Sequence, residues 1–234
     1  GLINPDRNNF APRVALAWKP WNRKNPVVRI GYGIYYNPGT YDQFTSRLSA
    51  QPPFAQSTTV NTSLLNPLTL ATGLTVTPSG KTILNTFAVD RDYRTLYAQA
   101  WNIGFQSELP GALLAELNYL GTKGTHLDIQ EMPNQAPPGS ILTSEQRLAI
   151  RNATGFIYDT PAGNSIYHAA LVRIEKRFSS GLTFLASYTN AKLISDSVAS
   201  PIGFGNVEQV GTVGYQKGLY DRRAERSLDP TDVA

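Results

Sequence analysis

The chain has 234 residues, of which 16% are charged and none is cysteine. Because soluble globular proteins carry about 25% charged residues, this composition excludes a charged disordered segment, and the lack of cysteine excludes a disulfide scaffold, a zinc-thiolate site and a cysteine nucleophile. The net charge of +4 comes from 21 basic residues scattered among 17 acidic ones, so no basic stripe for nucleic acid forms.

Short segments with strictly alternating apolar and polar residues follow along the chain. They cover residues 13–18, 27–36, 100–109, 113–121, 169–178 and 182–188. In the second segment, Val28, Ile30 and Tyr32 share one face, whereas Arg29 and Gly31 lie on the other. A period of two residues with one apolar face predicts β-strands. The fold class expected is therefore all-β and antiparallel, with about six strands.

The connections between these segments are of two kinds. Short ones, at residues 19–26, around Pro110 and at 179–181, alternate with long ones at residues 37–98, 122–166 and after residue 190. Successive antiparallel strands put alternate connections at opposite ends of a sheet. The pattern therefore predicts tight turns at one end and long loops at the other, which is the asymmetry of outer-membrane β-barrels. Within the second long loop, residues 143–152 are predicted to form a short helix capped by Thr143.

Two features favour lipid as the environment of the apolar face. Most charged side chains of the predicted strands fall on the small or polar face; these are Arg13, Arg29, Glu108, Glu116, Arg173, Glu175 and Arg177, with Lys176 as the exception. Aromatic side chains of the apolar face gather near strand ends: Trp18, Trp21 and Phe178 near short turns, and Tyr36, Trp101, Tyr119 and Tyr188 near long loops. Aromatic belts of this kind anchor membrane barrels at the headgroup level.

Six strands cannot close around a water-filled lumen, so we expect them to belong to a larger barrel. The predicted piece is a curved sheet with open edges and a convex apolar face. A further strand is expected near the end of the chain, at Asp232 to Ala234.

Several stretches, in collinear order, resemble one family of receptors. They are Asn8 to Arg13, Val28 to Tyr36, Gln51 to Phe54, Trp101 to Gly104, Glu108 to Pro110, Asn118 to Leu127, Lys176 to Phe178, Ala186 to Thr189 and Arg223 to Arg226. These stretches are similar to TonB-dependent outer-membrane receptors of the Oar-like type, which are abundant in Acidobacteria and carry a carboxypeptidase-regulatory-like domain ahead of the plug. The resemblance extends over nearly the whole chain.

The resemblance implies a barrel of about 22 strands with an amino-terminal plug. Residues 1–234 would be a partial barrel domain, without the plug and the remaining strands. The implied function is solute capture by the outer loops, followed by TonB-dependent import across the bacterial outer membrane. The implied partners are membrane lipid, the TonB complex through the plug, and an unidentified siderophore, glycan or peptide. We expect no enzyme activity, no cofactor, no metal and no nucleic acid.

Two sets of residues are candidates for functional contacts. Loop residues that combine aromatic and cationic groups are candidates for solute binding: Tyr41, Phe44, Arg47, Arg91, Tyr93 and Arg94. Residues predicted to face the lumen or the plug are Arg29, Glu108, Glu116, Arg173 and Glu175. Simple loop packing is the alternative for the first set. For the second set, a salt-bridged wall or a contact surface for the plug is favoured over direct contact with the solute.

Two other classes of protein share the strand pattern. One is a passive porin or an adhesin in the same membrane, which would lack the plug and the TonB box. The other is a soluble carbohydrate-binding β-sandwich, in which the apolar face would be covered by a second sheet.

Overall fold

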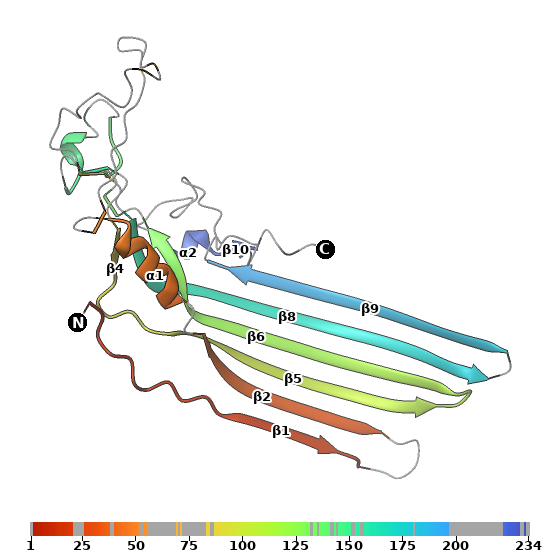
Figure 1. Ribbon diagram of the computed structural model, residues 1–234. Helices are drawn as coiled ribbons and strands as arrows, with labels where there is room; N and C mark the ends of the chain where they lie inside the picture. Colours follow the sequence, from red (N-terminus) through yellow and green to blue (C-terminus); the bar gives the residue numbers. More distant parts are fainter. Residues whose placement is uncertain are drawn as a thin grey trace.

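The computed structural model describes residues 2–20, 26–37, 40–51, 54–55, 69, 71, 83–84, 87–131, 133–134, 136–140, 143, 145–150, 153–154, 157–179, 181–196, 222–229 and 232. Six long strands form one layer, and the helices lie beyond one end of it (Figure 1). The long strands are β1 (Arg13–Trp18), β2 (Val27–Asn37), β5 (Leu96–Leu109), β6 (Leu113–Glu131), β8 (Ile157–Ser179) and β9 (Leu182–Ser195). The short elements are α1 (Thr40–Ser49), β3 (Ile83–Leu84), β4 (Phe87–Val89), η2 (Glu145–Arg147), β7 (Ala153–Thr154), α2 (Arg222–Glu225) and β10 (Ser227–Leu228).

The six long strands pair in antiparallel fashion in the order β1-β2-β5-β6-β8-β9. All six predicted strands are therefore confirmed. Among the described residues the sheet does not close on itself. Strand β1 pairs only with β2, and the part of β9 nearer the tight turns, residues 182–193, pairs only with β8. The short strand β10 pairs with Ile194 and Ser195, at the end of β9 nearer the long loops. It precedes in the chain the further strand that was expected near residue 232.

The strands are longer than their apolar stripe predicted. Residues 122–131 of β6 pair with residues 158–167 of β8, which leaves a second long loop of only about residues 132–156. Register shifts interrupt this extension at Leu127, next to His126, whose φ of 57° is left-handed. A lipid-facing strand alternates apolar and polar residues, and this alternation stops at the register shifts. The sequence pattern therefore predicts a loop where the structure has paired strands.

The paired register assigns each residue of the sheet to one of two faces. Phe105, Leu117 and Val172 pair directly on the apolar face, and each is exposed: 44%, 52% and 41%. No second layer covers them in the part of the chain that the structure describes (Figure 1). A soluble sandwich would bury this face, so the exposed row contradicts that alternative.

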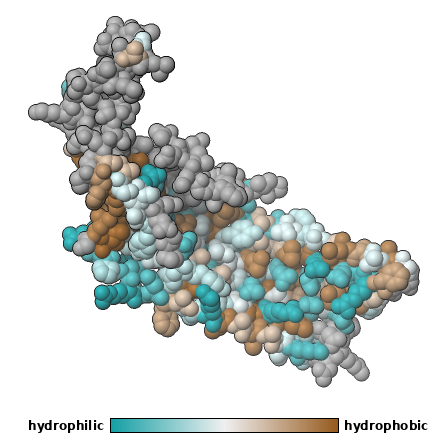
Figure 2. All heavy atoms as spheres, in the orientation of Figure 1, coloured by the Kyte–Doolittle hydropathy of each residue, from teal (hydrophilic) through white to brown (hydrophobic). Residues whose placement is uncertain are grey.

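The other face is mixed in character. Gln106, Glu116 and Arg173 pair directly across β5, β6 and β8 on it. Figure 2 shows one side of the molecule, on which hydrophilic and hydrophobic residues lie side by side over the strands.

Turns and loops separate to opposite ends of the sheet, as predicted (Figure 1). The turn between β5 and β6 has Gly111 at φ 86°, and the turn between β8 and β9 has Gly181 at φ 78°. A left-handed backbone costs glycine little, so both turns can be tight. Lys176, the charge on the apolar face nearest the tight turns, donates from Nζ to the carbonyl oxygen of Gly111 at 2.8 Å, and its cation is held at this turn.

An outer layer lies beyond the lipid-facing part of the sheet. We use this name for α1, β4, residues 90–95 and the paired extensions of β6 and β8. Phe44, Phe87 and Tyr93 form its core, with exposures of 3%, 7% and 1%. The rings of Phe44 and Tyr93 meet edge to face with centroids 4.7 Å apart. The Gln51 amide, just after α1, exchanges two hydrogen bonds with the backbone of Phe87, of 2.9 and 2.6 Å.

The helix predicted over residues 143–152 is wrong in extent. Within the described residues of that segment, only the single 3₁₀ turn η2 is helical. The Arg147 guanidinium bonds to the carbonyl oxygens of Pro137, Ser140 and Thr143, which ties the segment back on itself. The first turn of a helix fixes several dihedral angles for a single hydrogen bond. A segment as short as this one therefore forms a helix poorly on its own.

Helix α1 was not predicted, and Trp21, assigned to an aromatic belt, lies outside the described residues. No helix among the residues that the structure describes is long and apolar enough to cross a membrane.

Candidate functional site

A shallow hollow of about 470 Å³ lies on the polar face of the sheet, toward the end with the long loops. Its central row is formed by directly paired residues on five strands: Arg13, Gly33, Ala100, Thr122 and Tyr167. Gly33 and Ala100 have small side chains, whereas Arg13 and Tyr167 at the two ends are large. The hollow thus follows from the order of small and large residues along one row.

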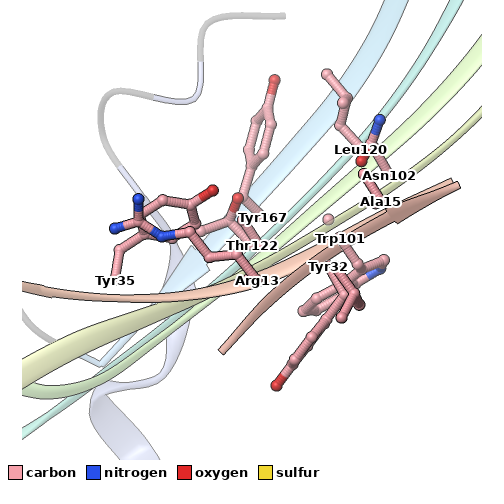
Figure 3. Close-up of a pocket in the computed structure, with 14 residues that line it drawn as sticks. Arg13, Ala15, Tyr32, Tyr35, Trp101, Asn102, Leu120, Thr122 and Tyr167 are labelled. Carbon is pink, nitrogen blue, oxygen red and sulfur yellow. The ribbon is translucent and has the colours of Figure 1, made fainter. Parts of the chain in front are cut away.

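Figure 3 shows which lining side chains share the polar side of the strands. Tyr167, Leu120 and Asn102 project to one side, whereas Trp101 and Tyr32 project to the other. Gly31 allows Asn102 to lean over it, since a Cβ on Gly31 would lie 2.3 Å from Asn102 Oδ1. The small residues are therefore part of how the polar side chains are held.

Arg13 and Tyr35 form one rim of the hollow. The Arg13 guanidinium carbon lies 4.5 Å from the centroid of the Tyr35 ring, a cation–π arrangement that Figure 3 shows from the side. A Cβ on Gly33 would lie 3.0 Å from this ring, so glycine at that position gives the tyrosine its place. Arg13 is the only charged residue among those that line the hollow.

The part of the polar face nearer the tight turns carries paired charges instead. Arg173 contacts Glu175 at 2.9 Å and Glu116 at 4.0 Å, and Arg177 contacts Glu108 at 3.8 Å. We call these five residues the charged wall. Four of the five residues predicted to face the lumen, Glu108, Glu116, Arg173 and Glu175, therefore lie together in it. The fifth, Arg29, donates to Gln106 Oε1 at 2.8 Å.

The candidate solute-binding residues of the loops fall into two groups. Phe44 and Tyr93 are in the core of the outer layer, and the Arg47 guanidinium lies 5.6 Å from the ring centre of Phe87. These three side chains pack within the layer. Tyr41, Arg91 and Arg94 are exposed, and solute contact remains a prediction for them.

Two carboxyl groups are buried in the outer layer, outside the lipid-facing part of the strands. Asp159 is completely buried, and neither of its carboxylate oxygens has a hydrogen-bond partner. Burial, together with the neighbouring Asp128, raises its pKa to about 8, although the Arg47 guanidinium and the Gln130 side chain oppose the rise. Burial also raises the pKa of Asp128, against the hydrogen bond that Tyr93 Oη donates to its Oδ1 at 2.9 Å.

Aromatic side chains mark both ends of the apolar face. Near the long loops, Tyr119 Oη lies 2.7 Å from His168 Nδ1, and the two rings stack with centroids 6.0 Å apart. Trp101 pairs with Gly121 and its indole ring lies over that glycine. A Cβ on Gly121 would lie 2.1 Å from the ring. Near the tight turns, Trp18 and Phe178 are exposed, at 58% and 77%. The described members of the two predicted belts are therefore on the surface.

The sequence did not indicate the hollow as a binding site. Arg13 was assigned to the polar face, but Asn102, Tyr35 and Tyr167 were not singled out, because they come from three strands far apart in the chain. The available signal was the run of small residues Gly31, Gly33 and Ala100 on one face, which becomes a floor only when the register is known.

A comparison with protein families agrees with this architecture. A family model described as an outer membrane beta barrel domain matches residues 1–234. The crystal structure of the outer membrane transporter YddB from Escherichia coli is similar, at 12% identity and a TM-score of 0.48. The similar region covers 80% of this chain and only 20% of that chain. No curated protein sequence matches the chain.

Proposed function

Because the chain belongs to the outer membrane β-barrel domain family and is located in the outer membrane, we propose that it is part of a TonB-dependent transporter. In this proposal, the outer end of the barrel receives a solute and an inner plug, moved by the TonB complex, allows it to pass. The protein carries out no bond chemistry. The Oar-like receptors are the type it resembles in sequence.

The observation that carries the proposal is the position of the hollow. It opens on the water-facing side of the sheet, at the end from which the long loops leave. A solute that arrives from outside would meet it before it meets the charged wall. Pockets that combine aromatic rings with a few polar groups are typical of small-molecule sites.

The charged wall fits contact with a plug. Arg173 lies between two carboxylates, and its side chain is 40% exposed. A polar plug surface can therefore reach this guanidinium and form charge-assisted hydrogen bonds with it.

The test is made on the product of the intact gene, purified in detergent from an outer membrane. We expect the protein to bind the isolated periplasmic domain of TonB, and we expect planar bilayers that contain it to show no steady ion conductance, since the plug fills the lumen. A passive porin would conduct ions and would not bind TonB. An adhesin would neither conduct nor bind TonB, and either result would contradict the proposal.

A further inference from the structure

We propose that the hollow is a binding subsite for an acidic, saccharide-like solute, with Arg13 as the group that binds the acid. This inference rests on the proposed function and names the class of solute. It depends on three properties of the hollow: its charge, its mixture of aromatic and polar groups, and its length.

The charge of the hollow favours an anion. Among the described residues of the lining, Arg13 is the only charged one, and none of them is a carboxylate that would neutralise it. Its guanidinium carbon lies over the Tyr35 ring, 4.5 Å from the ring centroid. An arginine held by a ring in this way can still use its N–H groups for a bidentate pair with a carboxylate.

The other lining groups favour a hydroxylated ring. Tyr35 on β2 stands next to Arg13, and Tyr167 on β8 ends the row; Asn102 and Thr122 come from β5 and β6, the two strands between β2 and β8. Tyrosine rings present an apolar surface to the flat faces of a ring, whereas the amide and the hydroxyl can both donate to and accept from sugar hydroxyls. A purely apolar solute would leave these polar groups without partners.

The length of the hollow favours an oligomer over a single ion. The row from Arg13 to Tyr167 crosses five strands. At about 4.8 Å between neighbouring strands, its ends lie about 19 Å apart. The Tyr35 ring lies against Gly33, and beyond it Ala100 and Thr122 form the floor as far as Tyr167, so a ring that stacks on Tyr35 can be continued toward Tyr167 without displacing a large side chain.

The plug is a less suitable occupant of the hollow than a solute. The charged wall, nearer the tight turns, already has opposite charges paired with each other. Arg13, at the loop end, is left with a ring and no acid. The Arg13 cation, near the end of the sheet with the long loops, is therefore suited to an acidic ligand that binds reversibly.

Binding of trigalacturonate to the detergent-purified, intact protein tests the inference, with maltotriose as the neutral probe. We expect trigalacturonate to bind, and Arg13→Gln to weaken its affinity about tenfold, as the loss of one charge-assisted pair predicts. Arg29→Gln is the matched control, because it removes the same charge from the same face of the sheet, on the neighbouring strand β2 and outside the hollow. We expect that control to change the affinity by less than about twofold.

Folding and occupancy have their own controls. Tyr167→Phe keeps the ring and should bind trigalacturonate nearly as well as the wild type, whereas Tyr167→Ala should bind it weakly. The inference is overturned if trigalacturonate does not bind, if maltotriose binds equally well, or if Arg29→Gln weakens binding as much as Arg13→Gln. It is also overturned if Arg13→Cys cross-links to another part of the intact polypeptide with no solute present.

The two proposals fail in different ways. Trigalacturonate binding without binding of the TonB domain would contradict the transporter and leave the subsite. Binding of the TonB domain with no trigalacturonate binding would leave the transporter and contradict the subsite.

Discussion

The outer layer and the lipid-facing part of the sheet are built for different solvents. The outer layer has a core of the kind found in water-soluble proteins, with Phe44 and Tyr93 almost completely buried. In the lipid-facing part, large apolar residues such as Phe105 and Leu117 are about half exposed within this chain. Burial inside the chain stabilises the first region. Backbone pairing and lipid contact stabilise the second, because every strand must satisfy its polar groups in a membrane.

The largest expected effect is on the core of the outer layer. Phe44→Ala should destabilise this layer by about 3–5 kcal/mol, the usual cost of deleting a buried ring, and should leave barrel assembly intact. Limited proteolysis of loop segments measures the first effect, and recovery from the outer membrane measures the second. Thr45→Ala, at an exposed residue of the same helix, is the control. Loss of the protein from the membrane would show that the two regions are not independent.

A charge on the apolar face should act on the other region. Leu117→Arg should cost about 2–4 kcal/mol of barrel stability, as for an arginine near the middle of the bilayer. Asn118→Arg, one residue along β6, places the same side chain on the polar face and should have little effect. Unfolding in urea from lipid vesicles measures both variants. Equal losses from the two variants would mean that both faces meet the same solvent.

The sequence predicted the lipid-facing region better than the outer layer. Alternation on β2, β5 and β6 repeats over many residues because one face meets lipid along its whole length, so strands, faces and turns could all be assigned. The outer layer depends on contacts between distant segments, such as the pair of Gln51 with Phe87, that no local pattern records. For the same reason, the sequence does not distinguish Phe44 and Tyr93, which pack in the core of this layer, from the exposed loop candidates Arg91 and Arg94.

The buried Asp159 gives the outer layer a pH dependence. Its pKa is about 8 in the folded protein, above its ordinary value of 3.8. The folded state therefore holds the proton more tightly than the unfolded state. This stability is complete below about pH 3.8, decreases as the pH rises, and is lost once the pH passes about 8.

Asp159→Asn should remove this dependence. Pulse proteolysis of the outer layer at pH 6 and pH 9, chosen on either side of about 8, should show a loss of stability at the higher pH in the wild type and little change in the variant. A wild-type layer of equal stability at both values would contradict the burial of an unpaired carboxyl group.

The smallest expected effect is at the aromatic belt. Tyr119→Phe removes the hydrogen bond to His168 Nδ1 and should cost about 1 kcal/mol, the typical net value of one such bond. Tyr188→Phe, at a residue 66% exposed on the same face, is the control for loss of a hydroxyl at the membrane surface. Urea unfolding from vesicles is the measurement, and equal effects would show that the Tyr119 bond adds nothing.

The central claim is that lipid meets one face of the sheet and water meets the other. It is tested most directly with two single-cysteine variants of the intact protein, Leu117→Cys and Asn118→Cys, each labelled with a fluorophore in lipid vesicles. We predict that brominated acyl chains quench the label at 117 and that aqueous iodide quenches the label at 118. Quenching of both labels by iodide, with none by brominated lipid, would contradict the account.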